Sequence, residues 1–172
     1  VVYVTHDQEE ALVLSDRIAI MKDGRIEQFD TPRGLFEGPR TPFVADFLGA
    51  ANFLTGKVEE TTADGCTSVR LDTGGILKAR AHPCAPGQKV RAAVRPSKLR
   101  LVGAEDSCCS GTVETAVYCG SLTRITVRLD GAAPGTPPLR IETAHTPPRP
   151  GERICVTAAP EDVSVFDATD GG

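Results

Sequence analysis

The chain has 172 residues with a formal net charge of -4, and 40% of its residues are hydrophobic. An acidic chain lacks the excess of Lys and Arg that neutralises phosphates, which argues against a general nucleic-acid binder. No apolar run approaches the roughly 18 to 20 residues needed to span a bilayer, and no charged-then-apolar leader opens the chain. These features predict a soluble, intracellular globular protein with one ordinary domain or two small ones.

The six cysteines show neither a disulfide pattern nor a metal-binding pattern. They include no C-x-x-C pair and no regular interval, and two of them, Cys108 and Cys109, are adjacent. Adjacent cysteines are poorly placed to bridge each other and are weak metal ligands. We therefore expect reduced thiols, buried or partly exposed, and no metal site.

An apolar segment followed by a helix start opens the chain. Residues 1–5, VVYVT, are β-branched and aromatic without polar alternation, which is typical of a strand buried on both faces of a parallel sheet. Such a strand is not stable alone and needs a sheet that this sequence does not supply. Asp7 then suits the N-cap of a helix, with Glu10 three residues later in a capping-box arrangement.

A hairpin and two short helices are predicted next. The Asp-Gly pair at 23–24 separates two apolar-patterned runs, 17–21 and 25–29, and this is a strong indication of a β-hairpin. A Thr-Pro pair predicts a helix over 31–36, because Thr suits the N-cap and Pro the first turn. A further helix is expected within 42–49, with one apolar face and a glycine as its stop.

From about Asn52 onward, short β-type runs alternate with turn residues. The expected strands are 53–59, 68–71, 76–79, 89–94, 99–102, 111–118, 123–129, 139–142, 153–157 and 163–166. Two Pro-rich stretches, 132–138 and 146–151, are expected to be loops, and no repeat is long enough to suggest a solenoid. About ten short strands at this spacing predict a compact antiparallel barrel or sandwich.

The first part of the chain carries an ordered series of short motifs. T-H-D at 5–7 is followed by Q-E-E-A at 8–11, D-R-I at 16–18, D-G-R-I at 23–26 and F-V-A-D-F-L-G at 43–49. In this order the segment closely resembles the end of the ATPase domain of ABC importers for polyamines, iron, maltose-type sugars and related solutes. The resemblance implies that this part of the chain is the C-terminal remnant of an α/β P-loop ATPase domain.

That resemblance makes His6 the switch histidine, a catalytic residue that sits beside the γ-phosphate and helps to position the attacking water. A neutral imidazole suits this role, because one ring nitrogen donates to a phosphate oxygen while a neighbour holds the other. Without the motif, a lone histidine after an apolar strand is more often a capping or core residue. For Asp7 the resemblance implies a contact at the nucleotide and dimer interface, which is compatible with its simpler role as helix cap.

Three motifs needed for ATP hydrolysis do not occur in this sequence: a G-x-x-x-x-G-K-[ST] phosphate loop, an apolar strand ending in Asp-Glu, and an S-G-G-Q-type signature. ATP and Mg²⁺ are therefore expected as cofactors of the intact subunit, with no tight binding to this chain. We expect the chain alone to be inactive as an ATPase.

The β-rich part resembles the TOBE domain, an OB-like barrel that follows the ATPase domain in the same importers. The resemblance rests on VRAAVRPSKLRL at 90–101, on G-T-V-E from Gly111 and on Y-C-G-S from Tyr118. Ser97 and Lys98 stand where the family usually has acidic residues. Arg95 could bind a regulatory anion or a partner carboxylate, but we favour the simpler interpretation that it braces the bend with the following proline.

Together these features predict a mainly β chain in three parts. Residues 1–51 would end an ABC ATPase domain, 52–168 would form an OB-like (TOBE) antiparallel β-barrel, and 169–172 would be a tail. The resemblance implies a subunit that couples ATP hydrolysis to solute uptake, cytoplasmic and peripheral on the inner face of the cell membrane. Its implied partners are a second ATPase subunit, the membrane permease and, indirectly, a solute-binding protein, with no nucleic acid. The β domain would serve dimerisation or regulation.

Two other classes of function remain open on the sequence. One is a stand-alone OB-type module for a small anion or an oligonucleotide, which is weakened by the acidity and by the shortage of stacking aromatics: two Tyr, six Phe and no Trp. The other is a dimerisation module without a ligand.

Overall fold

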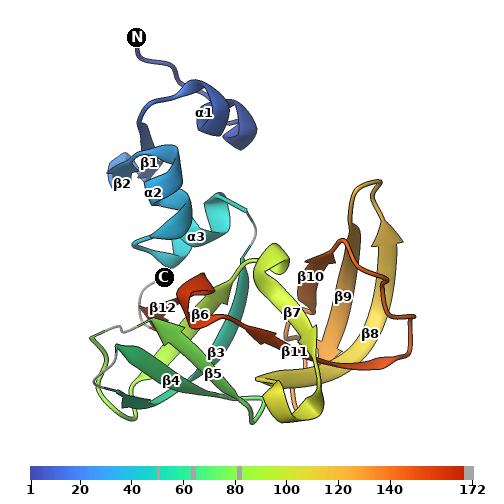
Figure 1. Ribbon diagram of the computed structural model, residues 1–172. Coiled ribbons are helices and arrows are strands. Elements are labelled where there is room, and N and C mark those ends of the chain that lie inside the picture. Colours follow the sequence, from blue (N-terminus) through green and yellow to red (C-terminus); the bar gives the residue numbers. More distant parts are fainter. Residues whose placement is uncertain (50, 63–64, 81–82, 169–172) are drawn as a thin grey trace. The chain divides into compact units, whose positions relative to one another are not determined.

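A computed structural model describes residues 1–172 except 50, 63–64, 81–82 and 169–172 (Figure 1). The tail predicted at 169–172 lies outside the described residues. The chain divides into two compact units, 1–50 and 51–168, which are taken in turn below. No helix in the described part of the chain is both long and apolar enough to cross a membrane.

The first unit contains a β-hairpin and three short helices: α1 (Gln8–Leu14), β1 (Ile18–Lys22), β2 (Arg25–Asp30), α2 (Pro32–Glu37) and α3 (Pro42–Phe47). Lys22 pairs with Arg25, so the connection has two residues, and both have positive φ: 50° at Asp23 and 76° at Gly24. Two positive φ values define the type I′ turn, whose twist matches that of the strands. The predicted hairpin is confirmed.

Both later helices begin at a Thr-Pro pair. The Thr31 hydroxyl accepts a hydrogen bond from the Gly34 N–H at 3.0 Å, and the Thr41 hydroxyl accepts one from the Val44 N–H at 3.3 Å. Each cap satisfies an amide that has no partner within the helix. The buried centre of the unit consists of Ile20, Leu35, Val44 and Leu48. The two predicted helices are confirmed.

The strand expected at 1–5 is not formed. Val1, Val2, Tyr3 and Val4 are exposed, and no described strand pairs with this segment. The prediction was wrong for this chain because a strand depends on a neighbour that supplies partners for its N–H and C=O groups. The β-branched residues therefore favour a strand, but the described part of the first unit has no neighbouring strand with which they pair.

Within its described residues the second unit contains ten strands, and each corresponds to one predicted run. They are β3 (Asn52–Thr61), β4 (Cys66–Leu71), β5 (Ile76–Arg80), β6 (Lys89–Val94), β7 (Leu99–Val102), β8 (Cys109–Tyr118), β9 (Thr123–Leu129), β10 (Leu139–Thr143), β11 (Arg153–Ala158) and β12 (Val163–Asp167). Three short 3-10 turns, Pro96–Lys98, Ala104–Asp106 and Pro160–Asp162, lie between strands. The predicted loops 132–138 and 146–151 contain no helix or strand. The prediction of a mainly β fold is confirmed.

The strands form two five-stranded antiparallel sheets, in the orders β12-β6-β3-β4-β5 and β10-β9-β8-β11-β7 (Figure 1). In each sheet the two edge strands also approach each other, β12 to β5 and β10 to β7, so both sheets curl in the manner of a barrel. One continuous cluster of buried apolar side chains is shared by the two sheets. The division of the ten strands into two curled sheets was not predicted, and it is new information from the structure.

The two sheets are structural repeats that exchange a strand. β3 to β6 and β8 to β11 follow the same path: a three-stranded meander, then a fourth strand that returns beside the first. The fifth strand of each repeat crosses over, because β7 pairs with β11 and β12 pairs with β6 (Figure 1). Neither repeat therefore completes its sheet without the other.

Local details recur at equivalent places in the repeats. Each first strand has a register shift, after Val58 in β3 and after Val113 in β8. The carbonyl at the shift accepts a backbone hydrogen bond in both repeats, from Gly87 at 2.7 Å and from Gly151 at 2.8 Å. These shared irregularities show that the repeats agree in detail as well as in topology.

Side-chain pairs recur as well. Thr55 donates to Asp72 at 2.7 Å, and Ser110 donates to Asp130 at 2.8 Å. An ion pair between the first two strands is also repeated, as Glu59–Arg70 and Glu114–Arg128. The same contacts in both halves indicate an internal duplication within the second unit.

A buried asparagine joins the two sheets. Asn52, at the start of β3, donates through its amide nitrogen to the carbonyls of Val94 at 3.2 Å and Arg140 at 2.8 Å. Its amide oxygen accepts from the Arg140 N–H at 2.7 Å. Each polar atom of this buried amide has a partner, so burial costs little and β10 is tied to the opposite sheet.

Two glycines are required where strands approach closely, and they provide a test of the packing. A Cβ at Gly56 would lie 2.3 Å from the Arg70 carbonyl oxygen, and one at Gly111 would lie 2.4 Å from that of Arg128. We expect Gly56→Ala and Gly111→Ala each to lower the free energy of unfolding by about 1 to 3 kcal/mol, measured by urea denaturation followed by circular dichroism.

Gly103→Ala is the matched control. Gly103 has a φ of -69°, which alanine adopts readily, and a Cβ there would meet nothing within 4 Å. Its free energy of unfolding should stay within about 0.5 kcal/mol of the parent. Equal losses at all three glycines would contradict the close-approach argument.

Candidate functional site

His6 lies in an exposed turn of the first unit, just before α1, and a small network fixes this turn. The Thr5 hydroxyl accepts from the Asp7 N–H at 2.9 Å and donates to the Glu10 carboxylate at 3.2 Å. The Asp7 carboxylate accepts from the Glu10 N–H at 3.1 Å, so Asp7 caps α1. The turn therefore holds the backbone at His6 while its side chain is exposed.

The capping box predicted with Glu10 is only half formed. The Glu10 carboxylate accepts from the hydroxyls of Thr5 and Tyr3, the latter at 3.3 Å, whereas the Asp7 N–H donates to Thr5. A threonine placed two residues before the cap competes for the amide that the glutamate would otherwise reach. The turn is nevertheless held to the first turn of the helix, as a complete capping box would hold it.

Arg95 lies in the second unit, directly before the turn Pro96–Lys98 that leads from β6 to β7. It is half-buried, and this burial lowers the pKa of its guanidinium, although an arginine stays charged in proteins. Its carbonyl accepts from the Lys98 N–H at 3.0 Å, which closes the turn. The structure thus places Arg95 at a bend and places His6 and Asp7 in the other unit.

Lys98 forms an ion pair that joins the two repeats. Its Nζ lies 2.9 Å from the Asp162 Oδ1, and Asp162 ends the equivalent turn of the second repeat, Pro160–Asp162. An acid at position 98, as the resemblance would favour, would face the Asp162 carboxylate and repel it. Lys98, which departs from the family pattern, is therefore paired with an acid, Asp162, of the other repeat.

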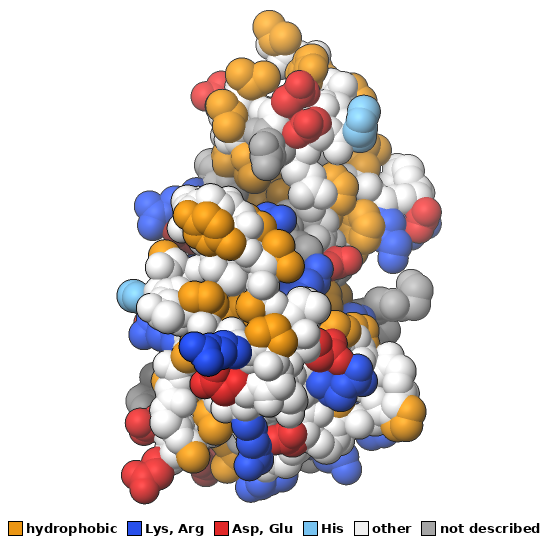
Figure 2. Space-filling model, turned by 90° about the vertical axis from the view of Figure 1, so that its right-hand side faces the viewer, with side chains coloured by type: hydrophobic (Ala, Val, Ile, Leu, Met, Phe, Trp, Pro, Cys, Tyr) orange, Lys and Arg blue, Asp and Glu red, His pale blue; other side chains and the backbone are white. Residues whose placement is uncertain are grey.

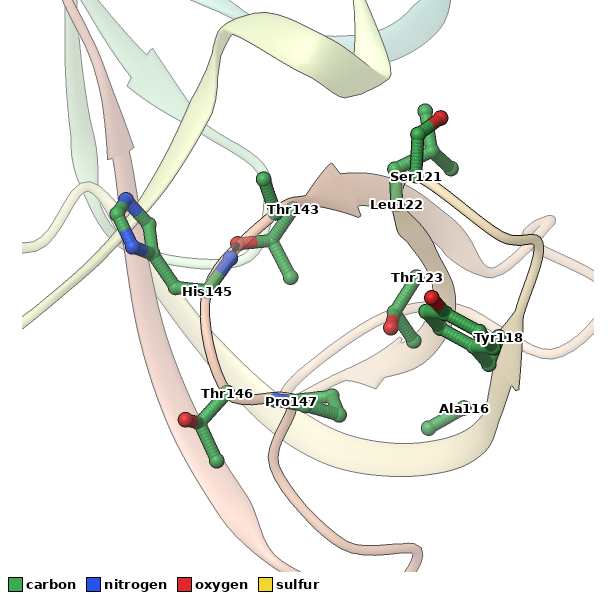
Figure 3. Close-up of a pocket in the computed structure, with 10 residues that line it drawn as sticks. Ala116, Tyr118, Ser121, Leu122, Thr123, Thr143, His145, Thr146 and Pro147 are labelled. Atoms are coloured by element: carbon green, nitrogen blue, oxygen red, sulfur yellow. Dashed lines mark hydrogen bonds between the residues drawn. The ribbon is translucent and has the colours of Figure 1, made fainter.

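A pocket of about 370 Å³ lies at one end of the second repeat (Figure 3). It is bounded by the end of β8, the turn into β9, and the end of β10 with the loop that follows. Its lining is Ala116, Tyr118, Ser121, Leu122, Thr123, Thr143, Ala144, His145, Thr146 and Pro147. We call it the hydroxyl pocket, since five of these residues carry a hydroxyl group. The sequence showed the Tyr118 turn as a family motif but gave no sign that three strand ends would surround a pocket.

Two of the cysteines lie in the shared core. Cys108 and Cys109 are buried with their Sγ atoms 3.8 Å apart, and the Cys108 thiol donates to the Val156 carbonyl at 3.3 Å. The contact with Cys108 and burial together raise the pKa of the Cys109 thiol well above its ordinary value. A thiol that stays protonated is a poor nucleophile and a poor metal ligand. Among the described residues, no group of three or more His, Cys, Asp or Glu is placed to hold a metal ion.

Comparison with known proteins shows which family and which relatives this chain resembles. Residues 92–166 match the model of the TOBE domain. The chain is 40% identical over 159 residues to the spermidine/putrescine import ATP-binding protein PotA of Rubrobacter xylanophilus, covering 90% of this chain and 42% of that protein. It is also 40% identical over 180 residues to the protein of the same name from Acidothermus cellulolyticus, covering 98% of this chain and 46% of the relative. The chain thus spans less than half the length of these curated relatives.

A solved structure resembles part of this chain in fold. The cytoplasmic molybdate-binding protein ModG superposes with a TM-score of 0.52 at 18% identity, over 66% of this chain and 94% of that protein. At this identity the likeness concerns the fold alone, and it agrees with the predicted OB-like architecture.

The TOBE match, the curled antiparallel sheets and the motif series of the first unit define a class: the chain belongs to the C-terminal, TOBE-containing region of the ATP-binding subunits of ABC importers. Within that class, the relatives described above are spermidine/putrescine import ATP-binding proteins. The family predicted from residues 5–49 and 90–101 is confirmed.

The ion pair between the repeats gives a test of the strand exchange. Lys98→Glu should lower the free energy of unfolding by about 1 kcal/mol or less, because both partners are partly exposed. Reversing the second charge as well, in Lys98→Glu with Asp162→Lys, should recover most of the loss, as measured by urea denaturation of the parent and both variants. The same reversal at exposed Lys78 in β5 serves as the control. Failure of the double reversal to recover stability would show that these two side chains do not interact.

Proposed function

We propose that this chain is part of an importer ATP-binding subunit that couples ATP hydrolysis to solute uptake through a membrane permease. The observation that carries the proposal is the 40% identity to an import ATP-binding protein over 90% of the chain, a span that includes both units. A stand-alone OB-type module is not favoured, because such a module would have no reason to retain the motif series of residues 5–49.

In this proposal His6 is a catalytic residue that donates to a phosphate oxygen and helps to position water. Its exposed side chain and the bonded turn formed by Thr5, Asp7 and Glu10 suit such a contact, since the backbone is fixed while the imidazole stays accessible. Asp7 would contact neighbouring loops or the partner subunit while capping α1. ATP and Mg²⁺ would be held mainly by groups that are not in this sequence.

Exposed apolar side chains on the first unit support a larger ATPase domain. Val13 and Leu14 of α1 and Met21 and Ile26 of the hairpin are exposed, as is the segment 1–4. Hydrophobic side chains are visible at the surface in the upper part of Figure 2, interspersed with acidic side chains. Several exposed large apolar side chains on so small a unit favour contact with other protein. We propose that further parts of the ATPase domain cover these side chains and pair with the 1–5 segment as a strand.

The partners proposed for the intact subunit follow from the family. They are a second ATPase subunit, the permease and, through the permease, a solute-binding protein, and the subunit would lie on the cytoplasmic side of the membrane as a peripheral component. The TOBE domain would serve dimerisation or regulation, with Arg95 as a candidate regulatory residue. The relatives are named for spermidine and putrescine import, so polyamines are the first solutes to test.

A chimaera tests the function directly. The corresponding region of the Rubrobacter xylanophilus relative is replaced by this chain, and ATP hydrolysis is measured in steady state. We expect turnover by the chimaera, a loss of roughly 10²-fold or more in kcat for His6→Ala, since one positioned donor is removed, and no turnover above background by the 172-residue chain alone. His145→Ala, in the second unit, is the matched control and should retain the parent rate.

The outcomes separate the parts of the proposal. A well-folded chimaera that does not hydrolyse ATP would argue against the proposed family function. An unchanged rate in His6→Ala would remove His6 from catalysis but leave the family function intact. Turnover by the 172-residue chain that disappears in His6→Ala would show that this sequence holds its own nucleotide site.

A further inference from the structure

We propose that the hydroxyl pocket of the second repeat binds a small, neutral, polyhydroxylated molecule of about the size of a hexose. The pocket measures about 370 Å³, toward the lower end of the roughly 300 to 1,000 Å³ typical of small-molecule sites. The inference rests on the chemistry of the lining and does not depend on the transport function proposed above.

The lining is rich in groups that both donate and accept hydrogen bonds. Ser121, Thr123, Thr143 and Thr146 carry hydroxyls and Tyr118 carries a phenol. In Figure 3 the Thr123 side chain lies beside the Tyr118 ring, whereas the hydroxyls of Ser121 and Thr146 point away from the other lining residues. A hydroxyl rotates to offer either its proton or a lone pair, so a set of them suits a ligand whose own hydroxyls also do both. Such hydroxyls can pair with those of a polyol, and the apolar part of the lining can contact its C–H groups.

The pocket offers no compensating charge. None of the ten residues that line it is Asp, Glu, Lys or Arg. The nearest charges along the chain, Arg124 and Glu142, follow and precede pocket residues, so their side chains point to the opposite face of the sheet. There they pair with each other at 3.1 Å. A polyamine or an oxyanion would lose hydration in this pocket without gaining an opposite charge, and this loss costs a charged group more than it costs a neutral hydroxyl.

Apolar surface lies beside the hydroxyls. Tyr118 is 75% exposed, and its ring lies next to the Thr123 side chain, with Ala116 and Pro147 close by (Figure 3). An exposed aromatic ring gives a flat apolar surface with a polar tip, which suits the C–H face of a sugar ring. The His145 imidazole points away from the Tyr118 ring, so it is given no ligand contact.

Three of the lining residues are placed by strand pairing. Tyr118 in β8 pairs with Thr123 in β9, which in turn pairs with Thr143 in β10. They form a row across three neighbouring strands, and the Thr143 hydroxyl accepts from the His145 N–H at 3.1 Å, which fixes the start of the following loop. Side chains held on adjacent strands are arranged before a ligand arrives, and this reduces the entropy cost of binding.

The test is an NMR titration of the ¹⁵N-labelled 172-residue chain with D-glucose, with D-maltose as a larger neutral probe, and with spermidine and molybdate as charged probes. We expect saturable shifts from a neutral sugar in the amides of 116–123 and 143–146, and no saturable shifts there from the charged probes. Tyr118→Ala should weaken sugar binding about tenfold, the effect of losing one good contact. Because Tyr118 is exposed, this change leaves the core intact, and Tyr3→Ala in the first unit is the matched control.

Thr123→Val provides a second variant, which keeps the shape of the side chain and removes its hydroxyl. It should also weaken binding, with the amide spectrum showing that the fold is kept. Absence of saturable shifts with both sugars would overturn the proposal, as would equal affinity in Tyr118→Ala and the parent. Saturable binding of spermidine or molybdate in these amides would replace the neutral ligand by a charged one and would equally overturn it.

Discussion

The exchange of one strand between two repeats is the constraint on which the second unit depends. β7 supplies the partner for β11 and β12 supplies the partner for β6, so neither sheet satisfies its backbone groups without the other half of the chain. Asn52 adds a buried amide bonded to both sheets, and the shared apolar core leaves no boundary at which the halves could part. We therefore infer that the ten strands fold as one cooperative unit.

Local chemistry explains how much of this fold could be predicted from the sequence. The Asp23-Gly24 turn, the Thr-Pro helix starts and the ten alternating runs act within a few residues of each other, and each of them formed as predicted. The division into two sheets and the strand exchange are pairings between distant segments, which alternation does not specify. The duplication itself is visible in retrospect, since V-R-L-D occurs at 69–72 and 127–130 and P-G at 86–87 and 150–151. The matching segments are short and the loops between them differ, so the sequence alone does not predict the duplication.

The candidate sites show the same limit. His6 could be found from its motif, and the cap by Asp7 from spacing alone, whereas the route of Glu10 to Thr5 and Tyr3 depends on how the segment before the helix folds back. The pattern of residues 1–5 favours a strand, but a strand forms only beside a neighbouring strand, and a local pattern does not show whether one is present. The hydroxyl pocket could not be predicted from the sequence, because Tyr118, Thr123 and Thr143 are brought together only by the register of three strands.

The differences between the repeats carry as much information as their likeness. At equivalent turns the first repeat has Lys98 and the second has Asp162, and the exchange brings these opposite charges to 2.9 Å. Two identical repeats would place like charges at this point, either two acids or two lysines, and would repel each other. At this point the two repeats are therefore complementary in charge. The ion pair thus adds a charge interaction between the two halves to the exchanged strands and the shared apolar core.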